Sequence, residues 1–211
     1  MKKILAILVA LLAALAVQTV AFADGEMMPL QPTETQSETS NGAVVLAEGS
    51  IEYNEINYTV LTVPSGGENG TVEVGPYQDA SGDITIPATI TNGENTYTVT
   101  SIGNSAFSMC SGLTSVTIPD GVTSIGDFAF SWCSGLTSVT FQGAEPPTFD
   151  GDPFLGCPRL GTISLTADMT EEQLTAWENS LTKLEINKEK INHTGKIITP
   201  DPDPEPEPTP T

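Results

Sequence analysis

Residues 101–123 read SIGNSAFSMCSGLTSVTIPDGVT, and residues 124–146 read SIGDFAFSWCSGLTSVTFQGAEP. Aligned without a gap, these two 23-residue segments are identical at 14 positions. The identities are ordered, because apolar residues match apolar residues, as Val116 matches Val139. Self-similarity at a fixed period of about 20 to 50 residues is typical of a solenoid, in which each repeat forms one coil.

Weaker copies of the pattern flank this pair. Upstream, residues 84–87 (ITIP) echo residues 116–119 (VTIP). Downstream, residues 154–165 repeat the Phe, Cys and Leu positions and two further apolar positions, with one inserted residue. A further L-x-x-L-x-I pattern follows at residues 181–186. Together these copies predict about five rungs.

The segment L-T-S-V-T-I within the first repeat alternates apolar and polar residues, which is the period of a strand with one buried face. We expect Val116 and Ile118 to point inward, and Ser115 and Thr117 to point outward. One repeat buries too little apolar surface to fold alone, whereas stacked repeats place like side chains above like. The period and the L-x-x-L-x-L strand predict a short leucine-rich-repeat solenoid of parallel β-strands.

A solenoid needs covers, because its ends expose apolar side chains and unpaired strand groups. Residues 43–83 contain short β-rich runs between Gly and Asn turns, and we interpret them as an N-terminal cap. Thr170 and Gln173 form a capping-box pattern that opens a short helix to about Ser180. We expect this helix to replace the back turn of the last coil, so that the solenoid and its C-terminal cap span residues 84–192.

Residues 1–23 have the parts of an export signal: a positive start at Lys2 and Lys3, an apolar run over residues 4–17, and a small-x-small pattern ending at Ala23. The alternative is a membrane anchor, but the run is shorter than the roughly 20 residues that a span needs. We expect cleavage after Ala23. The mature chain is then secreted or held at a cell surface, without membrane insertion.

Two segments are predicted to lie outside the fold. Residues 24–42 are rich in Thr, Ser, Glu, Gln and Pro, which predicts a flexible spacer. Residues 193–211 predict a Pro-rich, acidic tail that is stiff and extended where Pro alternates with Asp, Glu or Thr.

The chain is strongly acidic. Its formal net charge is -20, and removal of Lys2 and Lys3 with the signal changes this to -22. Such a chain repels nucleic acid and anionic membranes, so we expect neither as a partner. We expect a monomer.

The run V-T-S-I-G-x-x-A-F-S-x-C-S-G-L-T-S-V-T-I-P, at residues 99–119 and again from residue 122, resembles the BspA-like leucine-rich-repeat surface proteins. The resemblance covers about residues 84–186. It implies a bacterial surface or secreted protein that adheres to host or microbial macromolecules, without supplying a ligand. This chain departs from the pattern in its short array, and in Met109 and Trp132, which occupy a position that is often Gly.

Few residues suit catalysis, so we expect no enzyme and no cofactor. His193 is the only histidine, and we interpret it as an ordinary surface residue beyond the last rung. The motifs of serine hydrolases, zinc proteases and phosphate-binding loops are missing. Residues 150–152 (DGD) suggest calcium, but calcium needs six or more converging oxygens, and a solvated turn is the simpler interpretation. We predict no metal site.

The three cysteines occupy equivalent repeat positions: Cys110, Cys133 and Cys157. A small, weakly polar side chain stacked on itself suits a buried ladder, and we expect free core thiols. Zinc ligation is an alternative. A Cys110–Cys133 disulfide also stays open, because adjacent coils lie about 4.8 Å apart.

The concave strand face is the first candidate binding site. Its outward positions carry small, uncharged hydrogen-bonding groups on a rigid sheet, which suits a protein loop or a glycan. The alternative is that Ser and Thr simply suit exposed strand positions. The candidate residues are Ser115, Thr117, Ser138, Thr140, Gln142, Thr162 and Ser164.

Trp132 is the second candidate. Because its neighbours in the pattern point inward, Trp132 should point outward on the turn side, together with Met109. An exposed Trp is a common interface anchor, although it can also merely shield the turn. The function we predict is a secreted or surface-displayed binding module for an extracellular protein or glycan. The alternative is a structural spacer of the cell envelope without a specific ligand.

Overall fold

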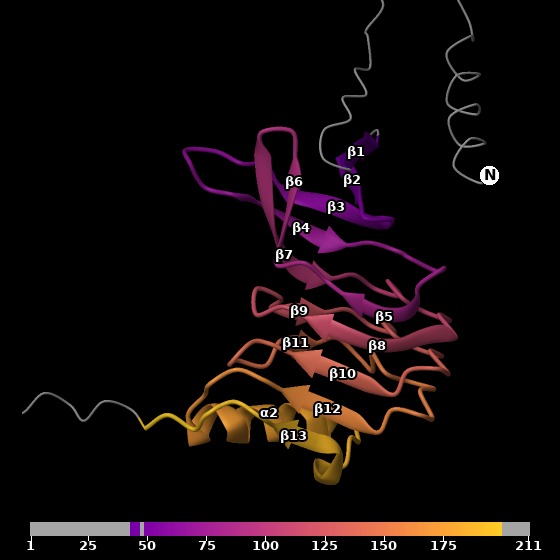
Figure 1. Cartoon of the computed structure of the whole chain (residues 1–211), viewed down its shortest axis with the longest axis vertical. Helices are drawn as coiled ribbons and strands as arrows, with labels where there is room; N and C mark the ends of the chain where they lie inside the picture. Colours follow the sequence, from indigo (N-terminus) through magenta and orange to yellow (C-terminus); the bar gives the residue numbers. More distant parts are fainter. Residues whose placement is uncertain (1–42, 47–48, 200–211) are drawn as a thin grey trace, which may run out of the picture. The chain divides into compact units, whose positions relative to one another are not determined.

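The computed structural model describes residues 43–46 and 49–199. The expected export signal and spacer lie outside this part of the chain, as does the tail from residue 200 onward. Two β-sheets form most of the described structure, and the chain winds between them coil after coil (Figure 1). Within residues 43–46 and 49–199, no helix is both long and apolar enough to cross a membrane.

One sheet contains the repeat strands, all paired in parallel, in the order β13-β12-β10-β8-β5. Val116 lies beside Val139, which lies beside Ile163, so like positions of successive repeats are neighbours. This arrangement confirms the predicted leucine-rich-repeat solenoid. The strands are β5 (Ser81–Thr85), β8 (Gly112–Ile118), β10 (Ser138–Phe141), β12 (Thr162–Leu165) and β13 (Ile191–His193).

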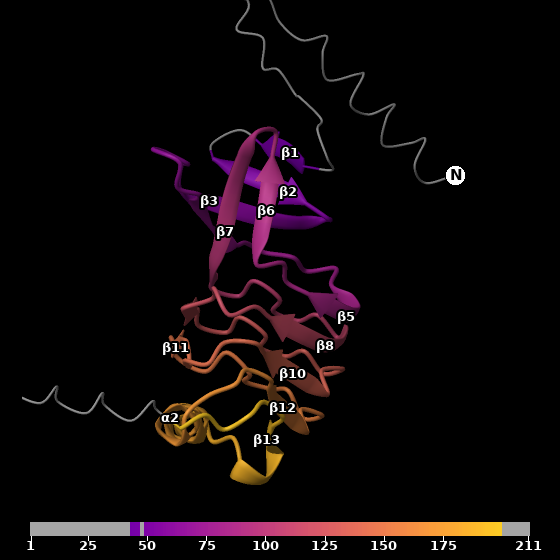
Figure 2. The same cartoon turned by 60° about the vertical axis from the view of Figure 1, so that its left-hand side comes forward.

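The second sheet joins the N-terminal cap to the solenoid. Its path runs β1-β2-β3-β4-β7-β9-β11, with β6 paired to β7. Along this path neighbours are antiparallel up to β4 and parallel from β4 onward, whereas β6 pairs antiparallel with β7. The cap thus covers the first coil by continuing its sheet (Figure 2). The strands are β1 (Ala43–Leu46), β2 (Ser50–Tyr53), β3 (Ile56–Thr62), β4 (Gly70–Val74), β6 (Thr89–Asn92), β7 (Asn95–Ile102), β9 (Ser124–Ile125) and β11 (Thr148–Phe149).

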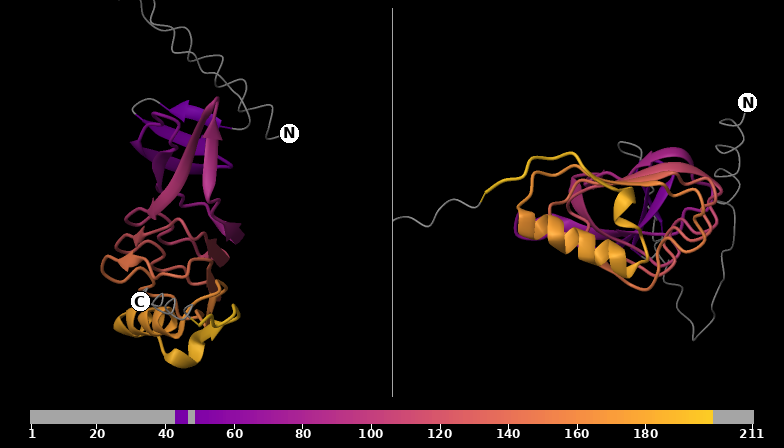
Figure 3. Two further views of the ribbon diagram at one scale, coloured as in Figure 1. Left: turned by 90° about the vertical axis from the view of Figure 1, so that its left-hand side faces the viewer. Right: turned by 90° about the horizontal axis from the view of Figure 1, so that it is seen from below.

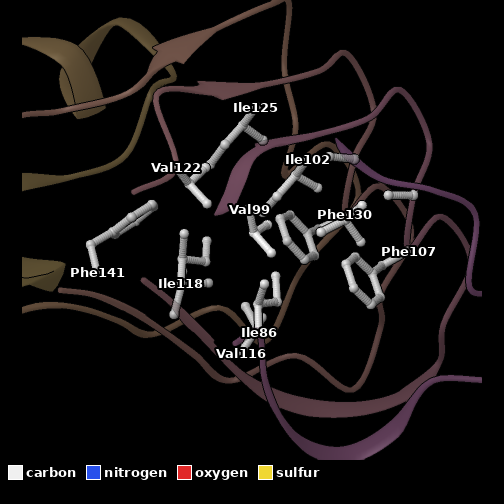
Figure 4. Close-up of a cluster of buried hydrophobic side chains, with 14 of the residues drawn as sticks. Ile86, Val99, Ile102, Phe107, Val116, Ile118, Val122, Ile125, Phe130 and Phe141 are labelled. Carbon is white, nitrogen blue, oxygen red and sulfur yellow. The ribbon is translucent and has the colours of Figure 1, made fainter. Parts of the chain in front are cut away.

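The core lies between the two sheets and consists of ladders of equivalent side chains. Phe107, Phe130 and Phe154 form one ladder of stacked rings, with centroids 5.2 Å and 5.6 Å apart. Burial of each such side chain contributes about 1.5–3 kcal/mol, and a single coil has no partner for it. In Figure 4, Val116 and Ile118 of the repeat sheet, with Ile86 directly after β5, face Val99, Ile102 and Ile125 of the second sheet across the core.

Helix α2 (Glu171–Lys183) closes the C-terminal end of the stack (Figure 3). It begins with the predicted capping box, in which the backbone N–H of Gln173 donates to Thr170 Oγ1 while Gln173 Oε1 accepts from the backbone N–H of Thr170. Trp177 is the buried side chain that anchors α2. The centroids of its ring and of the Phe141 ring lie 4.7 Å apart, and its Nε1 donates to the carbonyl of Ala144 at 3.0 Å. A short 3-10 helix, η1 (Lys188–Lys190), leads into β13.

Three expectations for the C-terminal region are wrong. Residues 181–186 form the end of α2 and the turn after it rather than a strand, and the last strand is β13. His193 is therefore part of the last rung, half-buried, with Nε2 3.0 Å from the carbonyl oxygen of Ala167. Met169 and Ile197 form a parallel bridge, so the fold continues past the expected start of the tail at residue 193. Parallel pairing with β12 satisfies the backbone groups of β13.

Candidate binding surfaces

The strand face of the repeat sheet carries two rows of outward side chains. Strand pairing places Ser115 beside Ser138 and Ser138 beside Thr162. The second row runs through Thr117, Thr140 and Ser164. All six are half-buried, whereas the residues between them on each strand are fully buried. The structure thus brings these six predicted residues together on one face.

Gln142 lies just beyond the end of β10, where its backbone N–H donates to the carbonyl of Ile118 at 3.0 Å. Its side chain is exposed and follows the buried Phe141, so it continues the outward series after Thr140. The seventh predicted residue therefore borders the same face.

Three further residues of this face were not predicted from the sequence. Register places Asp83 beside Ser115 and Thr85 beside Thr117, both on β5. Residues 84–87 (ITIP), which resemble residues 116–119 (VTIP), contain Thr85 and directly follow Asp83. Both positions could therefore have been predicted from the sequence. Asn192 of β13 pairs with Ser164, and β13 lies outside the repeats predicted from the sequence.

Asp83 supplies the one carboxylate on the five strands of this sheet. Its Oδ1 accepts hydrogen bonds from Ser115 Oγ at 2.6 Å and Thr114 Oγ1 at 2.7 Å. Because both donors stabilise the ionised form, they lower the pKa of the Asp83 carboxyl. The edge of the face is thus negative, while the rest is uncharged.

Most hydroxyls on the strand face have no internal partner. Within the described residues, those of Thr117, Ser138, Thr140, Thr162 and Ser164 form no hydrogen bond with another residue. Other threonines, outside this face, do form such bonds: the hydroxyls of Thr123, Thr137, Thr148 and Thr166 donate to carbonyls of the preceding coil. The strand-face hydroxyls are therefore available to solvent or to a bound molecule.

Trp132 and Met109 occupy equivalent places in the back turns, with side chains 60% and 74% exposed. Both have a left-handed backbone, with φ of 57° and 65°, and the equivalent residue of the next coil is Gly156 at 74°. Only glycine adopts this conformation without strain, which explains why the position favours Gly. Their exposure agrees with the expected outward direction, whereas a role in binding stays a prediction.

All three cysteines are free, as expected, although Cys157 is only half-buried. Each thiol donates to a carbonyl oxygen of the preceding coil: Cys110 to Tyr77 at 3.2 Å, Cys133 to Phe107 at 3.0 Å, and Cys157 to Phe130 at 3.0 Å. These bonds explain why a small, weak donor recurs at this position.

The Cys133 and Cys157 thiols also interact with each other. The neighbouring Cys157 thiol and burial raise the pKa of Cys133, whereas the neighbouring Cys133 thiol lowers the pKa of Cys157. Within the described residues, no group of three or more His, Cys, Asp or Glu side chains is arranged to hold a metal ion.

Stacked coils with parallel L-x-x-V-x-I strands and a buried apolar core define a leucine-rich-repeat solenoid, a repeat scaffold that presents surfaces. A family model described as the BspA type leucine rich repeat region matches residues 84–197 in six copies, which is more than half of the 211 residues. The chain belongs to this BspA-type leucine-rich-repeat family. No curated protein matches it.

Several solved structures are similar in part. A leucine-rich repeat protein from Bacteroides capillosus ATCC 29799 is 24% identical with a TM-score of 0.40, over 56% of this chain and 99% of that one. A leucine rich cell surface protein from Faecalibacterium prausnitzii A2-165 is 29% identical with a TM-score of 0.41, over 61% of this chain and 34% of that one. A leucine-rich repeat protein from Bacteroides ovatus ATCC 8483 is 26% identical with a TM-score of 0.36, over 56% and 33%. This chain thus spans about a third of the last two.

Proposed function

We propose that this chain is a non-enzymatic binding module, secreted or displayed on a bacterial surface, that contacts an extracellular protein or glycan through its strand face. The observation that carries the proposal is the pair of adjacent rows of outward Ser and Thr side chains, most of whose hydroxyls have no partner among the described residues. These groups lie on strands held in register by a common core.

A rigid array of short side chains suits recognition. Binding loses free energy when flexible side chains become ordered, and Ser and Thr have little freedom to lose. Each hydroxyl both donates and accepts, so the face complements a peptide backbone or sugar hydroxyls equally well. The chain's net charge of -20 disfavours polyanionic partners.

The test is a binding measurement with purified extracellular proteins and glycans on an array. We compare the wild-type chain with Thr140→Lys, in the centre of the face, and with Thr175→Lys, an exposed position on α2. Both variants change the net charge equally. The proposal expects a specific array member whose binding falls at least about ten-fold in Thr140→Lys and stays unchanged in Thr175→Lys.

Two results would overturn the proposal. Equal loss in both variants would indicate a charge effect rather than contact at the strand face. Absence of specific binding to every member would favour the envelope spacer instead.

Export has its own test. If residues 1–23 act as a signal, mass spectrometry of the protein recovered outside the cytoplasm gives a chain that begins at Asp24. A recovered chain that keeps Met1, or retention of the protein in the cytoplasm, contradicts this location.

A further inference from the structure

A groove of about 520 Å³ lies beside Trp132, at the C-terminal corner of the solenoid. One side belongs to the back turn of the third coil, which is the coil that ends in β12, and includes Leu155 and Gly156. The other side is the turn after α2 and includes Leu184 and Glu185. The groove exists because α2 takes the place of the next back turn, so no further coil covers this corner.

The indole of Trp132 forms one wall and is held in place. A side chain on Gly156 would collide with it, because a Cβ built there lies 2.9 Å from Trp132 Cδ2. The indole therefore packs against a backbone that lacks a side chain, while the ring remains 60% exposed. Trp132 has a left-handed backbone where the next coil has glycine, so the back turn itself does not require an aromatic residue at this position.

The charges around the groove are predominantly negative. The carboxylates of Asp152 and Glu185 line it, and neither forms an ion pair within the described part of the chain. Asp152 Oδ1 accepts from the backbone N–H of Phe154, which leaves its other oxygen unused. The one cation in the lining, Lys190, donates from Nζ to the carbonyl of Leu160 at 2.7 Å. The lining therefore carries two carboxylates against one ammonium, an excess of negative charge that favours a cationic group.

We propose that this groove binds an arginine side chain from an extended, cationic segment of a partner protein. The guanidinium stacks on the exposed face of Trp132 and pairs with Asp152 or Glu185, so cation–π attraction and an ion pair act on one group. The inference rests on the proposed function, because it assumes that the chain is a binding module and names the kind of partner that it binds. It concerns a surface separate from the strand face.

The chain contains its own control for the test, because it has only two tryptophans. Trp177 is fully buried and its Nε1 is hydrogen-bonded to Ala144, so its indole N–H signal differs from that of Trp132. We titrate the full chain with a short, capped peptide of alternating Gly and Arg, and follow both signals by NMR. A twin peptide with uncharged citrulline and a neutral cello-oligosaccharide are the other two probes.

The proposal expects the arginine peptide to move the Trp132 signal and not that of Trp177. It expects the citrulline twin to bind about ten-fold more weakly, and added salt to weaken the arginine peptide. Asp152→Asn and Glu185→Gln each weaken binding, whereas Glu94→Gln removes the same charge on the distant β6–β7 turn and has no effect. Binding to Trp132→Ala is followed by isothermal titration calorimetry, and we expect it to be abolished, with the Trp177 signal showing that the variant is folded.

Three results would overturn the inference: equal binding of the citrulline twin, a Trp132 response to the oligosaccharide but not to arginine, and no Trp132 response at all. None of them changes the outcome expected for Thr140→Lys, because that experiment probes the strand face with other ligands. A failure of the groove and a failure of the proposed function are therefore distinguishable.

Discussion

The rings of Phe107 and Phe130 stack with 5.2 Å between their centroids and 3° between their planes. Twenty-three positions separate them along the chain, which is one repeat. Phe154 extends the stack at 5.6 Å. The middle ring therefore stabilises two neighbouring coils, and in a repeat protein such nearest-neighbour contacts carry most of the stability.

Phe130→Ala removes the middle ring of this stack. We expect the free energy of unfolding to fall by about 3–5 kcal/mol, because the change leaves a cavity in the core. Urea denaturation followed by circular dichroism measures this loss. Phe128→Ala is the control: this ring is 41% exposed, and we expect a loss of less than about 1 kcal/mol. Equal losses in the two variants would contradict the stacked-ladder description.

Met109→Gly should stabilise the chain. The left-handed backbone of Met109 costs about 1–2 kcal/mol for a residue with a side chain, whereas glycine loses about 0.5–1 kcal/mol in backbone entropy. Since the side chain is largely exposed, little burial is lost, and we expect a net gain of about 1 kcal/mol. Met109→Ala keeps the strain and should give no gain. A Gly variant no more stable than the Ala variant would show that this position is unstrained.

Cys157 should be the one thiol that reacts in the folded chain. It is half-buried, whereas Cys110 and Cys133 are buried, and the neighbouring Cys133 thiol lowers its pKa. Because the thiolate is the reactive form, the reaction of Cys157 should accelerate at a lower pH than that of an ordinary cysteine. Alkylation followed by mass spectrometry should show one modified thiol in buffer and three in urea. Equal reactivity of Cys110 in buffer would contradict the burial order.

The Asp83 carboxyl should titrate below its ordinary value of 3.8. The hydroxyls of Ser115 and Thr114 stabilise its charged form in the folded chain only. Their contribution to stability is therefore fully present above the unfolded pKa, and is lost as the pH falls through the lower folded pKa. NMR titration of the carboxyl carbon measures this directly. Ser115→Ala should raise the pKa of Asp83, whereas Ser138→Ala on the next strand should leave it unchanged.

The fold was predictable from residues 101–146, because near-identical repeats must form near-identical coils. The register of β8, β10 and β12 followed, since these strands are 23 and 24 residues apart. The register of the last strand, β13, could not be predicted in this way. Ile191 of β13 pairs with Ile163, 28 residues earlier, because α2 lengthens the connection and breaks the period.

The candidate sites were predictable to different degrees. Alternation along one strand is enough to place Ser115 and Thr117 on its outer face. The groove beside Trp132 was not predictable, because it depends on how the turn around Glu185 returns from α2 toward the third coil. Such a meeting of distant segments leaves no local pattern in the sequence.

The most direct test of the central claim is a contact map of the strand face by NMR of threonine methyl groups. The spectra are recorded for the free chain and for the chain saturated with the array member that it binds most tightly. The account predicts changes at Thr117, Thr140 and Thr162, and none at Thr175. Changes restricted to α2 or to the β6–β7 hairpin would contradict it.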